Sequence, residues 1–501
     1  MHDLDKGQIW FIAGSQHLYG DEPLAEVAAH ADRIVAKLND TTSLPSIEFV
    51  SKPVVTTEDE VRVACLEATR ADDCIGVIFW MHTFSPARMW ISGLKILSKP
   101  WLHLHTQFNR GIPWGSIDMD FMNLNQSAHG GREFGHIATK MGLRRKIVVG
   151  HWEDDLVHSQ IDDWVRSTLA WNDAQGAKIA RFGDNMRDVA VTDGDKVSAQ
   201  MRFGWSVNGF GMGDLTDYIA GVSESEVSDL EAEYASSYAM PSPGQESNVL
   251  ASAIRDAARI EIGMRQFLRD GRFKAFTTTF ENLHGLSQLP GLAVQRLMSD
   301  GYGFGAEGDW KTAGLVRAMK VMGHGLPGGA SFMEDYTYHM DPNAMLVLGA
   351  HMLEVCPSLA TEIPSLEVHP LSIGSKSDPA RLVFDAAPGP AVNVCLVDLG
   401  ERFRLIVNPI SIIAPPAHLP RLPVARAVWK PRPDLATAAH AWILAGGAHH
   451  TALSTAVGLP SILDLADIAG VECVVIREDT SISDLQKELR WNDAYYHLKE
   501  R

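Results

Sequence analysis

The chain has 501 residues, of which 46% are apolar and 21% charged, and its formal net charge is -18. This length exceeds a single ordinary core and predicts two to four domains, and the composition is that of a globular enzyme rather than a disordered or fibrous chain. The acidic balance argues against nucleic-acid binding, which needs clustered Lys and Arg. No uninterrupted apolar run reaches the roughly 18 residues that a membrane-spanning helix requires.

Five scattered cysteines, none in a C-x-x-C pair, favour a reducing compartment without disulfides. The first residues, Met-His-Asp-Leu-Asp-Lys-Gly-Gln, lack a basic segment followed by an apolar one, so we expect no signal peptide. Together these features predict a cytoplasmic protein.

The first third alternates buried-strand and helix patterns. Short apolar runs occupy residues 9–13, 47–50, 75–81, 101–105 and 147–149. An amphipathic stretch follows Pro23, and a capping box spans Thr57 to Glu60. This alternation predicts a parallel, doubly wound sheet, whose ligands bind beyond the carboxyl ends of the strands. The loops of interest are residues 15–17, 82–85 and 105–107, and His129 falls in what we expect to be a further glycine-punctuated loop.

A second α/β unit is predicted from about residue 177. It comprises a strand at 179–182, a long amphipathic helix at 248–268, a strand at 273–280, and a helix at 292–298 that Gly301 caps. The Gly-x-Gly-x-x-Gly string of residues 303–308 is not interpreted as a dinucleotide fingerprint, because it follows a helix end rather than a clear strand and no acidic residue is suitably placed after it.

After residue 326 the pattern changes to short alternating segments separated by Gly and Pro turns. The expected strands are residues 365–371, 380–384, 392–399, 403–407, 442–445 and 474–476, and a closing helix is expected near 483–490. This pattern is typical of antiparallel sheet or a small barrel.

Four side chains of the second half lie where charge is unusual: Glu307, Glu334, His351 and His450 are embedded in glycine or apolar sequence. Buried carboxylates are costly unless they are paired or bound to a metal. Any one of these residues alone is more readily explained as structural, but as a set of two carboxylates and two imidazoles they suit Mn²⁺, Co²⁺ or Mg²⁺ better than a thiolate-rich zinc centre.

At these and other motifs the chain resembles the L-arabinose isomerase family nearly end to end. The shared strings are Ile-Ala-Gly-Ser-Gln-His-Leu-Tyr-Gly (12–20), His-Thr-Phe-Ser-Pro-Ala-Arg-Met-Trp (82–90), Asp-Met-Asp-Phe-Met-Asn-Leu-Asn-Gln (118–126), Arg-Phe-Gly-Asp-Asn-Met-Arg (181–187), Gly-Asp-Trp-Lys-Thr-Ala (308–313), Ser-Phe-Met-Glu-Asp-Tyr-Thr-Tyr-His (331–339) and Ala-Gly-Gly-Ala-His-His-Thr (445–451).

The resemblance implies two Rossmann-like doubly wound α/β domains (residues 1–176 and 177–325) and a C-terminal β-rich, barrel-like domain (326–501) of the fucose/arabinose isomerase type. It implies a Mn²⁺ site built from Glu307, Glu334, His351 and His450, with His450 favoured over its neighbour His449. It also implies a homohexamer of two stacked trimers, in which the segment of His129 reaches a neighbouring subunit's site. The implied substrate contacts are Gln16, Leu18, Tyr19, His129, Met186, Phe280 and Ile373.

The implied reaction converts the aldose L-arabinose to L-ribulose, and we expect D-galactose to be converted to D-tagatose as well. Our hypothesis is that Glu307 and Glu334 divide the proton transfers of a cis-enediol route, and which of them takes the C2 proton stays open. A metal-assisted hydride shift is a second route. Two other functions are compatible with the residues alone: a metal-dependent sugar epimerase or aldolase, and a non-catalytic sugar-binding protein.

Overall fold

The computed structural model describes residues 4, 6–240, 247–371 and 376–499. The chain forms two compact units, which are considered separately: Asp3–Asn172 with Pro460–Ile468, and Asp173–Leu459 with Ala469–Arg501. Among the helices of the described residues, none is long and apolar enough to cross a membrane.

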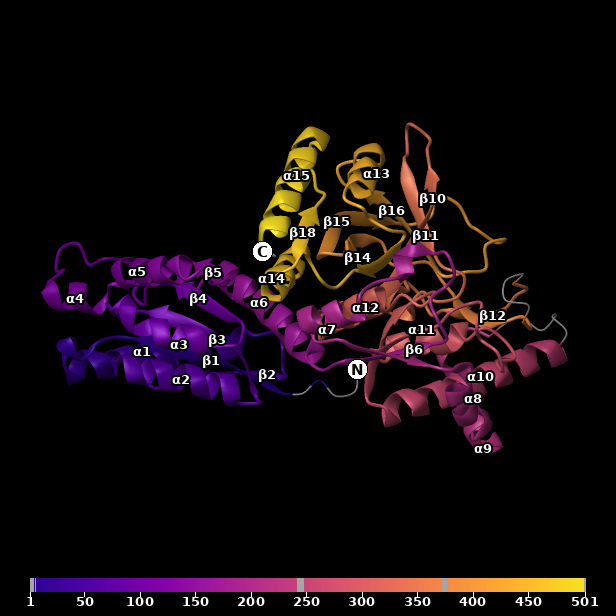
Figure 1. Cartoon of the computed structure of the whole chain (residues 1–501), viewed down its shortest axis with the longest axis horizontal. Coiled ribbons are helices and arrows are strands. Elements are labelled where there is room, and N and C mark those ends of the chain that lie inside the picture. Colours follow the sequence, from indigo (N-terminus) through magenta and orange to yellow (C-terminus); the bar gives the residue numbers. More distant parts are fainter. Residues whose placement is uncertain (1–3, 5, 241–246, 372–375, 500–501) are drawn as a thin grey trace. The chain divides into compact units, whose positions relative to one another are not determined.

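The N-terminal unit is built on a five-stranded parallel sheet of order β2-β1-β3-β4-β5 (Figure 1). Its strands are β1 (Gly7–Gly14), β2 (Ile47–Ser51), β3 (Cys74–Met81), β4 (Trp101–His105) and β5 (Lys146–Val149). The helices are η1 (His17–Tyr19), α1 (Asp21–Thr41), α2 (Glu58–Arg70), η2 (Ala87–Trp90), α3 (Ile91–Ile96), α4 (Met119–Leu124), α5 (Ser127–Lys140), and, for most of their length, α6 (Asp155–Ala174) and α14 (Leu459–Ala469).

Helices cover both faces of this sheet, as the buried strands β1 and β3 at its centre require. Cys65 of α2, Leu94 of α3 and Phe134 of α5 belong to one core cluster on one face. On the other face α6 lies so close to β3 that a Cβ on Gly76 would be 2.9 Å from a Thr168 methyl carbon. The expected doubly wound fold and the capping box from Thr57 to Glu60 are both confirmed.

One expectation for this unit is wrong: His129 lies in the first turn of helix α5, not in a loop. The glycines that follow it serve close packing instead of a turn. A Cβ on Gly130 would lie 2.6 Å from the Thr83 carbonyl oxygen, and one on Gly131 would lie 2.5 Å from Nδ1 of His105. Glycine therefore allows α5 to approach the ends of β3 and β4.

The larger unit begins with a second parallel sheet, of order β7-β6-β8-β9. The strands are β6 (Lys178–Phe182), β7 (Ser206–Phe210), β8 (Phe273–Thr277) and β9 (Gly303–Gly305). The helices are η3 (Ala190–Thr192), α7 (Lys196–Phe203), α8 (Met212–Ala220), α9 (Glu224–Ser237), α10 (Ser247–Asp270), α11 (Gly291–Ser299) and α12 (Trp310–Met322). This second Rossmann-like sheet is confirmed, although the strand expected over 273–280 ends at Thr277.

The glycine-rich string of residues 303–308 also differs from expectation, because its first part is the strand β9, paired in parallel with β8. Helix α12 crosses directly over it: a Cβ on Gly303 would lie 2.1 Å from the Ala313 carbonyl oxygen, and one on Gly305 would lie 2.2 Å from that of Asp309. The string is thus a true strand–turn–helix connection, and its turn holds Glu307.

The C-terminal part of this unit is a closed antiparallel barrel of order β14-β17-β10-β11-β16-β15, which the pairing of β14 with β15 completes. Its strands are β10 (Ala330–His339), β11 (Leu346–Ala350), β14 (Gly389–Asp398), β15 (Phe403–Ile413), β16 (Arg426–Pro431) and β17 (His450–Ser454). A further strand, β18 (Glu472–Val475), pairs in parallel with β15. The strands β12 (Ser365–Val368) and β13 (Ala380–Val383) form a separate two-stranded sheet. The expected barrel-like domain is confirmed.

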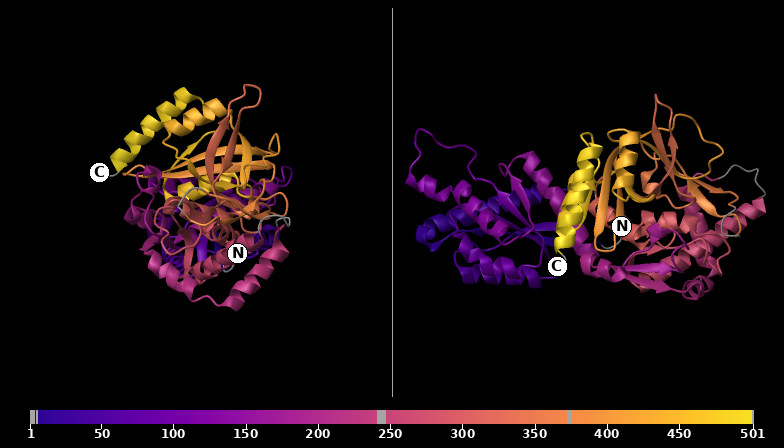
Figure 2. Two further views of the ribbon diagram at one scale, coloured as in Figure 1. Left: turned by 90° about the vertical axis from the view of Figure 1, so that its right-hand side faces the viewer. Right: turned by 45° about the horizontal axis from the view of Figure 1, so that its top comes forward.

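Residues 442–445, expected as a strand, instead end the helix α13 (Leu435–Leu444), whose N-cap is Asp434. Ala438 and Ala441 of α13 pack with Leu485 and Leu489 of the C-terminal helix α15 (Ile482–Lys499). Figure 2 shows the two helices beside the barrel strands. The connection from β11 also contains the short helix η4 (Pro357–Leu359).

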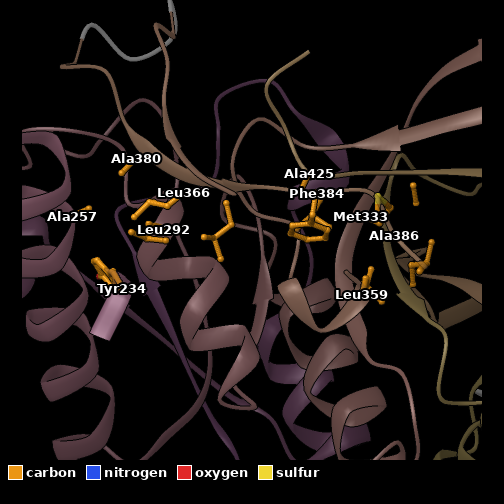
Figure 3. Packing of buried hydrophobic residues seen from close by; sticks show 14 of the residues in the cluster. Tyr234, Ala257, Leu292, Met333, Leu359, Leu366, Ala380, Phe384, Ala386 and Ala425 are labelled. Atoms are coloured by element: carbon orange, nitrogen blue, oxygen red, sulfur yellow. The ribbon is translucent and has the colours of Figure 1, made fainter. Parts of the chain in front are cut away.

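One core cluster of the described residues joins the α/β part of this unit to its β-rich part. In Figure 3, Leu292 of α11 lies near Tyr234 and Leu366, and the same cluster continues to Met333 of β10. Burying side chains of this size contributes about 1.5–3 kcal/mol each. The cluster therefore packs the β-rich part against helices α9, α10 and α11 of the α/β part.

Candidate metal centre

The register of three barrel strands brings three of the four predicted ligands together. Glu334 of β10 lies directly opposite His450, the first residue of β17. On its other side Glu334 pairs with Ala350, the last residue of β11, so that His351 follows immediately. Because neighbouring strands lie about 4.8 Å apart, this register alone sets both imidazoles beside one carboxylate.

Glu307 reaches the same place from the turn between β9 and α12. Its backbone is left-handed, with φ of 59°, and so is that of Gly308, with φ of 86°. A left-handed conformation is uncommon outside glycine and costs of order 1 kcal/mol, and such residues cluster at functional sites. The turn is held by the bond from the Met186 amide to the Glu307 carbonyl oxygen, at 2.9 Å.

The four side chains approach one another through close pairwise contacts. Glu334 Oε1 lies 3.3 Å from Nε2 of His351 and 3.3 Å from Nε2 of His450, and Glu307 Oε2 lies 3.6 Å from the latter atom. Ligand-type atoms of Glu307, Glu334 and His351 all lie within 4.8 Å of one another, and the same holds for Glu307, His449 and His450. His449 is exposed, whereas His450 is wholly buried.

Each imidazole is held from behind by a further carboxylate that the sequence analysis missed. Nδ1 of His450 lies 3.0 Å from Asp309 Oδ2, and Nδ1 of His351 lies 2.5 Å from Glu354 Oε2. A carboxylate at Nδ1 orients the ring and leaves Nε2 for a metal. The His-x-x-Glu spacing of residues 351–354 was a signal for one of them, whereas Asp309 resembles an ordinary helix cap.

The charges of the centre are strongly coupled. Burial opposes ionisation of Glu334, but His351 and His450 outweigh it and hold the pKa of this carboxyl below its ordinary value. Burial also opposes a charge on His351, yet the Glu354 and Glu334 carboxylates raise the pKa of His351 to about 10. The pKa of His450 is likewise raised, against burial, by its contacts with Asp309 and the two glutamates. In the metal-free protein, protons on the imidazoles thus offset the carboxylates.

A divalent cation fits this arrangement of donors. Nε2 of His450 is buried and has no hydrogen-bond partner among the described residues. A buried nitrogen without a well-directed hydrogen bond is costly unless a bound group satisfies it, and here the nearest polar groups are the two carboxylates, at 3.3 and 3.6 Å. Two carboxylate oxygens and two imidazole nitrogens form a donor set that suits hard or borderline divalent ions.

Two of the predicted substrate contacts lie beside this centre. The Phe280 ring stacks on the His351 imidazole with centroids 5.8 Å apart, and Met186 adjoins Glu307 through the backbone bond described above. Phe332, not singled out from the sequence, packs edge-on against both His351 and His450, at 5.1 and 5.2 Å. Ile373 lies outside the described residues.

The other predicted contacts belong to the N-terminal unit, at the carboxyl edge of its sheet. Gln16 and Leu18 follow β1, and Leu18 is 85% exposed. The side chain of Gln126 joins the remaining two: its amide donates to the Tyr19 hydroxyl at 3.0 Å, and its carbonyl oxygen lies 3.0 Å from Nδ1 of His129. The structure thus groups Tyr19 with His129, and Gln126 was missed from the sequence.

Comparison with known proteins identifies relatives along nearly the whole chain. Residues 3–176, 178–325 and 329–472 match the family models of the L-arabinose isomerase N-terminal, central and C-terminal domains. A protein of Anoxybacillus flavithermus named L-arabinose isomerase is 60% identical over 98% of both chains. This chain is also similar to two further proteins of the same name. The protein of Geobacillus stearothermophilus is 59% identical over 99% of both chains, and that of Nocardioides sp. is 58% identical over 100% of this chain and 99% of the other.

Proposed function

We infer that this chain, which belongs to the L-arabinose isomerase family, is an aldose–ketose isomerase that converts L-arabinose to L-ribulose. The family resemblance noted in the sequence is confirmed by these relatives. The observation that carries the assignment to a site is the close approach of Glu307, Glu334, His351 and His450, whose ligand-type atoms lie 3.3–3.6 Å apart in the pairs described above.

We propose that this cluster binds one divalent cation through Glu307, Glu334, His351 and His450. Mn²⁺ suits the donor set, and Co²⁺ or Mg²⁺ are substitutes of the same class. When bound, the ion polarises the sugar's oxygen atoms and so makes the C2 hydrogen more acidic. Glu354 and Asp309 hold the two rings in the orientation that this binding requires.

The isomerisation moves a carbonyl from C1 to C2, so a proton must leave C2 and another must arrive at C1. Glu307 and Glu334 are the carboxylates that lie close enough together to divide this work: one takes the C2 proton while the other moves hydroxyl protons through a cis-enediol. Both lie within 3.6 Å of Nε2 of His450, which fits two groups acting on adjacent carbon atoms. Phe280 and Phe332 shield the imidazoles from water.

The competing route is a hydride shift from C2 to C1, which exchanges no hydrogen with solvent. Isomerisation in deuterated water distinguishes the two routes. Deuterium at C1 of the L-ribulose supports proton transfer by the glutamates, whereas a product without label would contradict it.

We also propose that the chain acts in the cytoplasm as a homohexamer, with Gln16, Leu18, Tyr19 and His129 serving a neighbouring subunit's site. Apolar side chains exposed after β1 and β4 support such a contact: Leu18 (85%), Trp114 (82%), Met119 (65%) and Met122 (52%). The carboxyl ends of parallel strands share one edge, so these residues follow the same edge of the sheet.

We propose that the chain consists of three domains, which comprise residues 1–176, 177–325 and 326–501.

A panel of aldoses tests the proposal directly. Chelator-treated protein should form no ketose, and added Mn²⁺ should restore L-ribulose formation from L-arabinose. We expect slower conversion of D-galactose to D-tagatose, since one extra hydroxymethyl group changes binding by only about 1–3 kcal/mol. Full turnover of L-arabinose by metal-free protein would contradict the proposed centre.

A further inference from the structure

Helix α12 contains two buried lysines, which is unusual because a buried ammonium group needs compensating partners. Every residue of this helix is buried, and Lys311 and Lys320 are 1% and 7% exposed. Lys320 donates to the Ala330 carbonyl oxygen at 2.6 Å. Lys311, by contrast, is paired with a carboxylate, that of Asp309, at 3.1 Å.

Asp309 lies between Lys311 and the metal centre. Its Oδ2 faces Nδ1 of His450 at 3.0 Å and accepts from the Thr312 hydroxyl at 2.7 Å. Its Oδ1 faces the Lys311 ammonium and the backbone N–H groups of Lys311 and Thr312. The three charged groups therefore form a buried row, from Lys311 through Asp309 to His450, that ends on the nitrogen offered to a cation.

Lys311 also holds in place the connection of residues 183–193 after β6, which carries Met186 and is called the Met186 loop below. Its Nζ donates to the carbonyl oxygens of Val191 at 2.8 Å and Asp193 at 2.6 Å. At its other end the same loop touches the turn of Glu307, where Asn185 Nδ2 donates to the Gly308 carbonyl oxygen at 3.3 Å. The approach is so close that a Cβ on Gly308 would lie 2.6 Å from the Asn185 Cα.

We propose that Lys311 is a positioning residue for the divalent cation: its ammonium group holds Asp309 behind His450 and ties the Met186 loop to the turn of Glu307. Without this charge, the Asp309 carboxylate would be buried with a hydroxyl, two backbone amides and one imidazole as its remaining partners. It would then be held less tightly, and so would His450, which contacts it. The inference rests on the proposed metal centre, but not on the identity of the sugar.

The experiment measures Mn²⁺ binding to chelator-treated full-length protein, by the electron paramagnetic resonance signal of free Mn²⁺. K311M removes both the charge and the bonds to the loop, whereas K311Q retains a donor for the loop carbonyls. Partners behind a ligating histidine are worth about 10–100-fold in affinity, and Lys311 acts one step further away. We therefore expect the dissociation constant of both variants to rise about 10-fold.

K320M is the matched control, because Lys320 is a second buried lysine on the same helix, roughly 13 Å along its axis, and does not contact Asp309. It should lower the thermal midpoint of the metal-free protein without changing Mn²⁺ affinity. A structural role of Lys311 alone would make K311M behave like K320M. Turnover of K311M should recover when Mn²⁺ is raised above its new dissociation constant.

Two outcomes would overturn the proposal: K311M and K311Q binding Mn²⁺ as tightly as the parent, or K320M weakening binding as much as they do. K311Q provides the comparison if K311M does not fold. Should the parent bind Mn²⁺ and the variants bind it less tightly, while L-arabinose is not turned over, Lys311 would keep its assigned role and the proposed reaction would fall. If the variants turn over L-arabinose normally and bind Mn²⁺ as tightly as the parent, the proposed reaction would stand and the role assigned to Lys311 would fall.

Discussion

Glu354 offers a sharp test of how the protein prepares an imidazole for a cation. Its Oε2 lies 2.5 Å from Nδ1 of His351 and also accepts the Leu353 backbone N–H at 2.9 Å. Both side chains are only 3% exposed. Because both contacts use the same oxygen, the amide oxygen of Glu354→Gln can keep both donors satisfied, whereas Glu354→Ala leaves Nδ1 without this partner.

The expected magnitudes follow from this difference. A hydrogen bond to a charged group contributes about 1.5–3 kcal/mol and a neutral one about 1 kcal/mol, and each 1.4 kcal/mol is tenfold in a binding constant. Glu354→Gln loses the charge but keeps the ring orientation, so Mn²⁺ should bind roughly fivefold more weakly. Glu354→Ala frees the ring to turn or change tautomer, and the loss should be roughly 10–100-fold.

The assay is the dissociation constant of Mn²⁺ for chelator-treated protein near neutral pH. Glu367→Gln is the control, because Glu367 makes a similar 2.6 Å contact with a histidine, His369, that is not one of the proposed ligands. Its affinity for Mn²⁺ should equal that of the parent. Equal losses in the Gln and Ala variants of Glu354 would refute the reasoning from ring orientation, and an unchanged Ala variant would remove Glu354 from the centre.

Four further predictions concern turnover, pH, sugar binding and stability. Glu334→Gln should leave the fold intact by circular dichroism but lower kcat roughly 10²–10⁴-fold; near-normal turnover with metal bound would exclude Glu334 from the proton transfers. In metal-free protein the pKa of His351 is raised from 6.5 to about 10, so its stabilising proton is fully bound below about pH 6.5 and lost as the pH rises towards 10. The urea midpoint of the metal-free protein should therefore fall over that range, and Mn²⁺ should flatten the trend because the cation replaces the proton; a midpoint that rises with pH would show that the charge balance is wrong. Gln126→Leu should raise KM for L-arabinose more than it lowers kcat, because Tyr19 and His129 lose their shared partner, and unchanged steady-state constants would speak against that role. Leu292→Ala, at a site 1% exposed in the large core cluster, should cost about 2–5 kcal/mol in urea unfolding, while Leu498→Ala, 69% exposed, should cost almost nothing; equal midpoints would contradict the packing described for α11.

Much of the α/β framework follows from local sequence. The strand expected at residues 101–105 is β4 without a change of boundary, and the helix at 292–298 ends as expected before Gly301. There the Gly301 and Tyr302 amides bond back to Met298 and Leu297, and Gly301 has a φ of 110° that glycine adopts readily. Buried parallel strands and capped helices leave strong local patterns because each element is defined by neighbours in the chain.

Local patterns gave wrong predictions of secondary structure where glycine, or a short apolar run, is compatible with two different structures. Gly130 and Gly131 suggest a loop by sequence alone, but in the structure they let helix α5 touch Thr83 and His105. Residues 442–445 form the end of a helix rather than the expected strand. A run of four apolar residues has no period that separates a strand from a helix end. The first difference comes from contacts with residues distant in the sequence, and the second from a pattern too short to separate the two structures.

The sequence by itself identified the residue types of the candidate centre, since carboxylates and imidazoles in apolar or glycine-rich surroundings are costly without a partner. It did not predict the strands β10, β11 and β17 that carry or precede three of them. Only the closed barrel decided that Glu334 faces His450, 116 positions away, and that Ala350 sets His351 on its other side. Such pairing depends on the register between distant strands, and so do the bonds from Asp309 and Glu354 that aim the two rings.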